Sequence, residues 1–303
     1  MKTDFHLPQS GFRIKKWQRS FRSLLFATVL GLLAGCVKDD LYDTPHPDKG
    51  AIVVQLDWSG ISPDAIPDDY VLNVDGKEQT ASGTTAVVEQ LAEPGEHTLL
   101  IYNRPEGITI EGDVASVDEV TSTAKARAAE VFIQPLPGYL FAARQKITVV
   151  PDDTLRVELP MVQRTRDLQF ELTVTEGDPE LIQSVKGVLT GIAGAFNLAE
   201  QQLTDHTANT VFAFTRKGNK LAADARLLGI VGTNHTLVLE IRFTDREDIH
   251  RVSLDLSEAM DGFNNDMTTI RKLTGSVETP IGMDVTASIT DWVDVEGSPV
   301  EAE

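Results

Sequence analysis

Apolar and polar residues alternate with a period of two along much of this chain, and this pattern constrains its fold more than any other feature. In segments 52–58 and 168–174 every second residue is apolar and large. Successive side chains of a strand point to opposite faces, so the pattern predicts strands with one buried face. Further strands are predicted at 70–74, 85–91, 97–102, 131–134, 145–150, 155–159, 184–190, 209–215, 221–230, 236–244, 250–256, 272–278 and 283–292.

Short strands separated by turns rich in Pro, Gly and Asp are typical of β-sandwiches, so we expect an all-β protein. The alternation weakens between Glu111 and Glu130, where we expect a short helix or a long surface loop. A second short helix fits residues 257–263. A polar and basic cluster at 160–167 interrupts the apolar pattern, and it predicts two sandwich domains, 51–162 and 163–303.

The charge balance of the chain bears on its partners. Residues 1–35 hold six cations and one anion, so the remainder carries 21 cations and 45 anions, a formal charge of −24. Nucleic acids and anionic membrane surfaces bind basic patches, and this composition argues against both as partners. The hydrophobic fraction of 41% is sufficient for a packed core.

The first 35 residues have the organisation of a signal peptide. Five cations lie between Arg13 and Arg22, and an apolar run extends from Leu24 to Leu33. This run has about half of the ~20 residues that a membrane-spanning helix needs. The segment 33–36, Leu-Ala-Gly-Cys, resembles a bacterial lipobox and contains the single cysteine of the chain. The resemblance implies cleavage between Gly35 and Cys36 and attachment of lipid to the Cys36 sulfur.

A charged and proline-containing segment follows the cysteine. Lys38, Asp39 and Asp40 resemble the export signal that carries Bacteroidota lipoproteins to the cell surface, although a solvated tether would have the same composition. Pro45 and Pro47 favour extended backbone, so we interpret residues 36–50 as a lipidated tether. Two or three acyl chains would anchor it stably in the outer membrane, with the protein on the cell surface.

We find no catalytic motif in the sequence. The Gly-x-Ser-x-Gly signature of serine hydrolases is absent, and Gly187-Val-Leu-Thr-Gly191 has leucine at the serine position. His-Glu-x-x-His is also absent, and the histidines occur singly. We therefore expect no enzyme activity, no metal ligands and no cofactor. A weak calcium site in the loop 261–266 is an alternative, although the loop lacks the ligand spacing of a calcium-binding hand.

Several of these features together resemble the FimB-type fimbrial anchor subunits of Bacteroidota, which are lipoproteins of type V pili. They are the lipobox with Cys36, the residues 39–41, the strand 52–58, the segment 187–198 and the terminal stretch 285–292. The resemblance implies two tandem transthyretin-like β-sandwich domains. It also implies a surface-exposed anchor or accessory structural subunit that takes part in cell adhesion and joins fimbrillin subunits by β-strand addition.

The alternative is an outer-surface glycan-binding lipoprotein of a polysaccharide-uptake system. Such proteins are also lipidated sandwiches, and they stack sugars on exposed aromatic side chains. After residue 35 the chain has only two tryptophans, Trp58 and Trp292. Trp58 lies on the apolar face of its predicted strand, and we expect both tryptophans in the core.

The two ends of the folded region differ in their expected role in strand addition. In that mode of assembly an extended segment of one subunit completes the sheet of the next. The resemblance implies that a stalk subunit opens its groove by losing its first strand. Here the strand 52–58 is joined to Cys36, so we expect it to stay. At the other end, Met283, Val285, Ala287 and Ile289 alternate with polar residues. They form either a donor strand or the last strand of the second sandwich.

A short motif near the middle of the chain suggests a modification. Asp153-Thr154-Leu155 resembles the Asp-Ser/Thr-apolar motif of O-glycosylated exported proteins of Bacteroidota. Three loosely defined positions also recur by chance, and a turn-to-strand junction explains the triplet equally well. Thr154 is thus a candidate glycosylation site.

Overall fold

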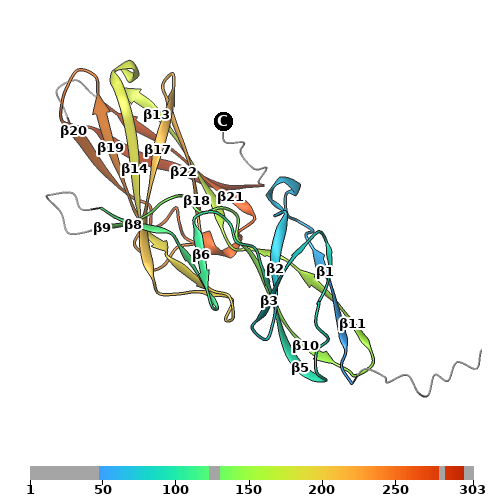
Figure 1. The fold of residues 1–303 in the computed structure, drawn as a ribbon. Helices are drawn as coiled ribbons and strands as arrows, with labels where there is room; N and C mark the ends of the chain where they lie inside the picture. Colours follow the sequence, from blue (N-terminus) through green and yellow to red (C-terminus); the bar gives the residue numbers. More distant parts are fainter. Residues whose placement is uncertain (1–47, 123–129, 280–283, 297–303) are drawn as a thin grey trace, which may run out of the picture. The chain divides into compact units, whose positions relative to one another are not determined.

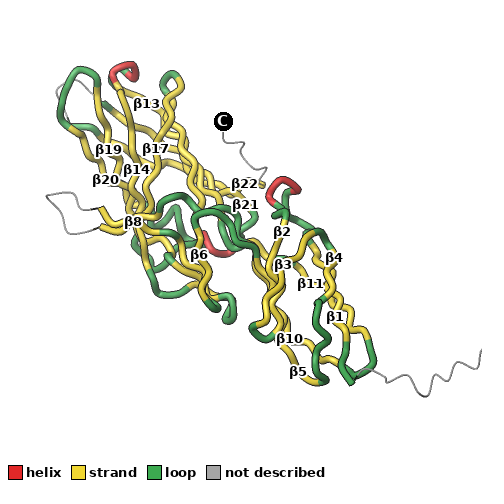
Figure 2. Tube along the Cα trace, in the orientation of Figure 1, coloured by secondary structure: helices red, strands yellow, loops and turns green. Residues whose placement is uncertain are grey.

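The computed structural model describes residues 48–122, 130–279 and 284–296 (Figure 1). Strands dominate this part of the chain, and its helical segments are three short 3-10 turns at Pro63–Ala65, Pro179–Leu181 and Phe263–Asn265 (Figure 2). Among the described residues, no helix has the length and apolar character needed to cross a membrane. The all-β sandwich class predicted from the alternation is confirmed.

Two sheets form the N-terminal sandwich. In the first, β1 (Ala51–Asp57) lies between β11 (Thr154–Pro160) and β4 (Thr85–Val87). The second has the order β12-β10-β5-β2-β3, with bounds Val162–Gln163, Phe141–Val149, Gly95–Tyr102, Asp69–Val74 and Lys77–Ser82. The apolar face of β1 packs against this second sheet in one hydrophobic cluster. Trp58 lies in that cluster, edge-to-face with Phe141 at a centroid distance of 5.4 Å, as its position in the alternation predicts.

The C-terminal sandwich is built from a larger, folded-over sheet. Its strand order is β20-β19-β14-β17-β18-β13-β21-β22. The bounds are Ile249–Asp255, Thr236–Phe243, Ile182–Ala193, Thr207–Lys217, Lys220–Leu227, Arg166–Glu176, Thr269–Glu278 and Thr286–Glu296. Phe170 of β13 stacks on Phe212 of β17 at 5.2 Å, so these strands face each other across a second hydrophobic cluster.

The segment in which the alternation weakens forms strands, so the expected helix or loop there is wrong where the structure describes it. The strands within it are β7 (Val114–Val117) and β8 (Glu119–Ser122). They lie between β6 (Ile108–Glu111) and β9 (Glu130–Ile133), and β9 confirms the strand predicted at 131–134. β7 pairs with β15 (Ala195–Asn197), which pairs in turn with β16 (Gln202–Leu203), and β9 pairs with β17. These partners lie far away in the sequence. Their pairing overrides a weak local signal.

The short helix expected at 257–263 is also wrong. This segment is a series of turns, and a 3-10 turn begins only at Phe263. Gly262 adopts a left-handed conformation with φ 67°, which ends any helical path there. The loop is nevertheless well packed, because Ala259, Met260 and Phe263 are buried in the second hydrophobic cluster. Burial of these three side chains holds the loop backbone, and with it the backbone carbonyls, in place beside the neighbouring strands.

Candidate assembly surface

The first strand is held on both of its edges. β1 runs parallel to β11 over all seven of its residues, from the pair Ala51–Thr154 to the pair Asp57–Pro160. On its other side, Val53 to Gln55 pair antiparallel with β4. The side chains of Ile52 and Val54 are 0% exposed. Removing β1 would therefore take away the middle strand of its sheet and a large part of the core.

The last strand has a different environment. β22 pairs antiparallel with β21 from residue 286 to residue 296 (Figure 1). In the described part of the chain no strand is hydrogen-bonded to its other edge. An unpaired edge of this kind presents free backbone N–H and C=O groups to an incoming strand. β22 is thus one of the two edge strands of this sheet, with β20 at the other end of the strand order, and it is a candidate place for a further strand.

The described residues of the predicted donor strand are Val285, just before β22, and Ala287 and Ile289 on the inward face of its first half. Val285 is buried, and Ala287 and Ile289 pack against the second hydrophobic cluster. Met283 lies outside the described residues. The free chain thus uses this segment as the last strand of its own sandwich, and its donation to a neighbour stays a prediction.

A β-bulge divides β22 into two halves. Ile289 pairs with Gly275 while Asp291 pairs with Thr274, so Thr290 has no residue opposite it. The extra residue shifts the inward positions from odd to even numbers, and Trp292 and Asp294 then share a face with the buried Leu273 and Arg271. A Cβ atom on Gly275 would lie 2.0 Å from the Ser288 carbonyl oxygen, so glycine permits the close approach of the strands at the bulge.

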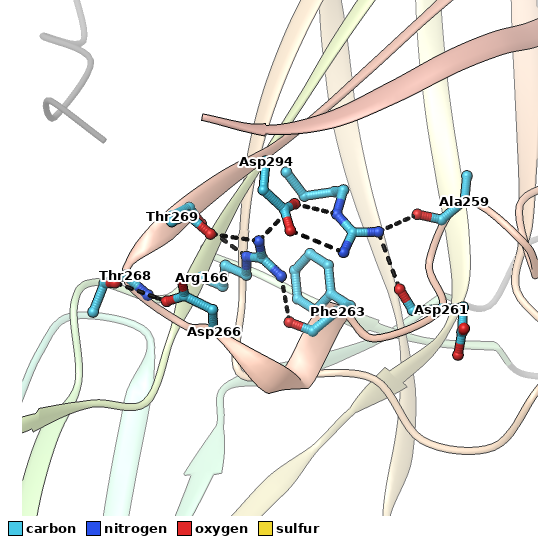
Figure 3. Close-up of polar contacts among 9 residues, drawn as sticks. Arg166, Ala259, Asp261, Phe263, Asp266, Thr268, Thr269 and Asp294 are labelled. Atoms are coloured by element: carbon cyan, nitrogen blue, oxygen red, sulfur yellow. Dashed lines mark hydrogen bonds and ion pairs between the residues drawn. The ribbon is translucent and has the colours of Figure 1, made fainter. Parts of the chain in front are cut away.

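Asp294 reaches two buried arginines because of this shift (Figure 3). Arg271 donates from Nε and Nη2 to the two carboxylate oxygens of Asp294, at 2.5 and 3.3 Å. Nη2 of Arg166, at the start of β13, lies 2.8 Å from Oδ1 of the same carboxylate. Arg166 is 0% exposed and Arg271 is 5% exposed, so both charges are buried. We call Arg166, Arg271 and Asp294 the arginine clasp.

Backbone carbonyls hold both guanidinium groups in place. Arg166 donates from Nε to the Thr269 carbonyl at 2.8 Å and from Nη1 to the Phe263 carbonyl at 2.5 Å, and its guanidinium lies over the Phe263 ring. Arg271 donates from Nη1 to the Ala259 carbonyl at 2.6 Å and to the Asp261 carbonyl at 3.1 Å. Burial lowers the pKa of Arg166, and the charge of Asp294 acts in the opposite direction.

Sequence reasoning missed the arginine clasp. Arg166 fell in the basic cluster that was interpreted as a boundary between domains, whereas the structure buries it completely. Asp294 follows the bulge, and no local pattern shows that its side chain points inward. The prediction that Trp292 lies in the core is wrong as well, because its position at the open edge leaves it 38% exposed. On the same strand Val293 and Val295 are 50% and 42% exposed.

The loop considered as a weak calcium site has another use. The Asp261 carbonyl accepts a hydrogen bond from Arg271, and the Asn264 side chain exchanges hydrogen bonds of 2.9 and 3.0 Å with the backbone of Ile230. Across residues 48–122, 130–279 and 284–296 no group of three or more His, Cys, Asp or Glu side chains could hold a metal ion.

The remaining predicted sites fall in two places. Thr154 begins β11, and its side chain is exposed and accessible. Its backbone N–H donates to the Asp153 carboxylate at 2.7 Å. Gly35, Cys36 and the export segment Lys38, Asp39 and Asp40 lie outside the described residues, so cleavage, lipidation and export stay predictions.

Sandwiches with open strand edges belong to a class of proteins that can join partners through their sheets. A comparison with protein families identifies the family within that class. The family model described as fimbrillin-A associated anchor proteins Mfa1 and Mfa2 matches residues 70–296. The chain belongs to this family. The resemblance found in the sequence is thereby confirmed, and the chain is a fimbrial accessory protein of the cell surface.

Solved structures show the same fold. One from Bacteroides ovatus ATCC 8483, described as a "putative adhesin", is 16% identical with a TM-score of 0.55, and the match covers 88% of this chain and 99% of that one. A second Bacteroides ovatus structure with the same description is 9% identical with a TM-score of 0.56, covering 87% and 98% of the two chains. No curated protein matches the chain by sequence.

Proposed function

We propose that this protein is a surface lipoprotein that serves as an anchor or accessory structural subunit of type V-like fimbriae and joins fimbrillin subunits by β-strand addition. The observation that carries this proposal is the contrast between a first strand paired on both edges and a last strand with one free edge. Lipid on Cys36 holds the N-terminal end at the outer membrane, and the export segment places the protein on the outer face.

The fixed first strand makes the protein a terminus of the polymer. A subunit that accepts a donor strand needs an open groove in its sheet. Here β1 occupies the place between β11 and β4 that a donor strand would take. Cleavage after β1 would also separate the folded protein from Cys36. The subunit therefore accepts no donor at this end, and the fibre continues from β22.

Strand addition at β22 has two modes. In the first, the segment with Met283, Val285, Ala287 and Ile289 leaves its own sandwich and inserts into a neighbour. In the second, β22 stays and a fimbrillin strand pairs with its free edge. Truncation after Gly282 separates the two. A folded monomer that retains no fimbriae supports donation, whereas loss of the fold supports edge pairing.

A variant that blocks the edge tests the joining function directly. Val293→Lys combined with Val295→Lys places two charges beside the free edge, and charged edge residues oppose further strand pairing. The substituted side chains are exposed, so we expect folding stability to change by no more than about 0.5 kcal/mol. Fimbriae should be shed into the medium of cells that carry this variant. Val150→Lys, at an equally exposed valine outside β22, is the control. Normal retention of fimbriae by the double variant would contradict the proposal.

The anchor is tested on intact cells. Incorporation of labelled palmitate should be lost in Cys36→Ala, and external protease should degrade the wild-type protein. A lipidated protein that is fully protected from external protease would instead face the periplasm.

Glycan binding is the second candidate function, and the exposure of Trp292 is the observation that favours it. An indole at an open sheet edge can stack on a sugar ring. Calorimetry with bacterial and host polysaccharides would detect such binding, and Trp292→Ala should abolish it. If the protein is a surface glycan receptor, it should bind the sugar. The Val293→Lys and Val295→Lys double variant should then leave the retention of fimbriae unchanged.

A further inference from the structure

The arginine clasp brings two cations to one carboxylate. Asp294 is the carboxylate that contacts both Arg166 and Arg271 among the described residues. Asp266 also attracts Arg166, but its Oδ1 accepts from the backbone N–H and the hydroxyl of Thr268 at 2.9 and 2.7 Å. Buried cations are strongly unfavourable without an anion, so the site requires a carboxylate at this position.

The protein builds this site without help from β22. Thr269 and Phe263 hold three nitrogen atoms of Arg166 through the backbone and the Thr269 hydroxyl. Ala259 and Asp261 hold Nη1 of Arg271, which leaves its Nε and Nη2 pointing together at Asp294. This edge of a guanidinium matches the two oxygens of a carboxylate, and it is the geometry of bidentate recognition.

The carboxylate that fills the site belongs to a strand that can leave. Asp294 lies near the end of β22, its side chain is 42% exposed, and the strand has one hydrogen-bonded neighbour among those described. The receptor lies on β13 and β21, whereas the ligand lies on the outermost strand. Withdrawal of β22 would thus leave a preformed anion site beside the newly exposed edge of β21.

We infer that Arg166 and Arg271 form a carboxylate receptor, that Asp294 fills it in the free protein, and that an Asp or Glu of an incoming fimbrillin strand fills it when β22 is displaced. This inference rests on the proposed strand addition, in the mode in which β22 leaves its sandwich. It assigns a chemical requirement to the partner strand. A strand with an uncharged residue at this register leaves Nε and Nη2 of Arg271 without an acceptor. Because hydrogen bonds to charged groups are strong, we expect such a strand to bind roughly tenfold more weakly, or worse.

Chemical rescue tests the receptor in the full-length chain. Asp294→Ala removes the resident carboxylate and leaves space for a small anion. Formate should raise the melting temperature of this variant with saturation, and chloride at equal ionic strength should not. Glu296→Ala, which removes an exposed carboxylate of the same strand, is the matched control and should show no rescue. If the alanine variant does not fold alone, formate but not chloride should restore its folding, measured by circular dichroism. A melting temperature that responds equally to formate and chloride would overturn the inference.

A peptide tests the partner strand. A labelled peptide with the sequence of residues 286–296 should bind the Asp294→Ala chain at least about tenfold more tightly than the same peptide with Asn in place of Asp294. Equal binding of the two peptides, or no binding of either, would overturn the carboxylate requirement. Both measurements use purified protein without fimbriae. Their failure is therefore distinct from a failure of the proposed anchoring, which is measured as retention of fimbriae on cells.

Discussion

The first and last strands of the described chain are stabilised in opposite ways. β1 has a neighbour on each edge and buries its apolar side chains in the first hydrophobic cluster. β22 has one hydrogen-bonded neighbour there, and in its second half a carboxylate on two buried arginines replaces apolar burial. The apolar side chains of β1 cannot leave without breaking the core. The carboxylate of Asp294 lies at an open edge, and a carboxylate of another strand can take its place.

This difference indicates how an anchor can be permanent at one end and able to join at the other. The strand that follows the predicted tether is held by neighbours on both edges and by burial of its apolar face. The strand at the other end presents a free edge, exposed apolar side chains and a carboxylate that can be replaced. Variants in the two strands should therefore fail in different ways.

The largest effect on stability is expected in β1. Ile52→Ala removes a fully buried side chain and leaves a cavity in the first hydrophobic cluster, which should lower the free energy of unfolding by about 2–5 kcal/mol. Gln55→Ala, at an exposed position of the same strand, should change it by no more than about 0.5 kcal/mol. Urea denaturation of both variants measures the difference. Similar values for the two would contradict the central role of β1.

A smaller effect is expected at the bulge of β22. In Gly275→Ala the new Cβ would lie 2.0 Å from the Ser288 carbonyl oxygen and 3.0 Å from the Ile289 Cα atom, so the strands must separate. We expect a loss of about 1–3 kcal/mol and faster amide exchange confined to β21 and β22. Ser276→Ala adds no atom and loses only the hydrogen bond of 3.1 Å between the Ser276 and Ser288 hydroxyls, so this control should cost less than Gly275→Ala. Exchange that accelerates equally in β1 would show that the two strands are not independent.

A pH effect is expected in the N-terminal sandwich. Nδ1 of His97 lies 2.6 Å from the Asp75 carboxylate and Nε2 lies 2.6 Å from the Glu93 carbonyl, so only the protonated ring donates to both acceptors. Glu93 and Asp75 raise the pKa of His97 above its ordinary value. The stabilisation is therefore fully present below the unfolded pKa of about 6.5, and it is lost as the pH rises through the higher folded value.

Melting curves across this pH range measure the effect. His97→Gln should remove the decrease in stability that the wild-type chain shows above neutral pH. Lys49, which pairs with Glu93 at 2.7 Å, keeps its charge throughout and does not contribute to the change. The hydrogen bonds and ion pairs that hold the clasp join Arg166 and Arg271 to Asp294, Thr269 and backbone carbonyls, and none of them involves a histidine. Formate rescue of Asp294→Ala should therefore be independent of pH between about 6 and 8, and a pH-dependent rescue would contradict this separation.

The smallest effect on stability is expected at Thr154. Its exposed side chain begins β11 opposite Ala51 of β1, so Thr154→Ala should change the free energy of unfolding by no more than about 0.5 kcal/mol. If the predicted glycosylation occurs, the intact mass of the native protein should exceed the polypeptide mass and the excess should disappear in Thr154→Ala. An unmodified wild-type protein would remove this prediction.

The sequence by itself determined which segments form most of the strands. The alternation in 52–58 and 168–174 depends only on the period of extended backbone. β13 includes all of the expected residues, and β1 includes all of them except Trp58. The buried positions of β1 also follow from it. The family resemblance rested on short motifs and on this strand pattern, and the family model confirms it. These properties are local, so they can be recognised without knowledge of the fold.

The tertiary structure alone decided how the strands combine and where the candidate site lies. β7 pairs with β15 of the second half, and its own residues carry little signal, whereas β9 was predicted from the sequence but its pairing with β17 was not. The bulge at Gly275 shifts the inward face of β22 by one residue, and this shift brings Asp294 to Arg166 and Arg271. Arg166 is 128 positions from Asp294 in the sequence. A contact over that distance depends on the pairing of β13 with β21 and of β21 with β22, and a period of two in one strand contains no information about its neighbours.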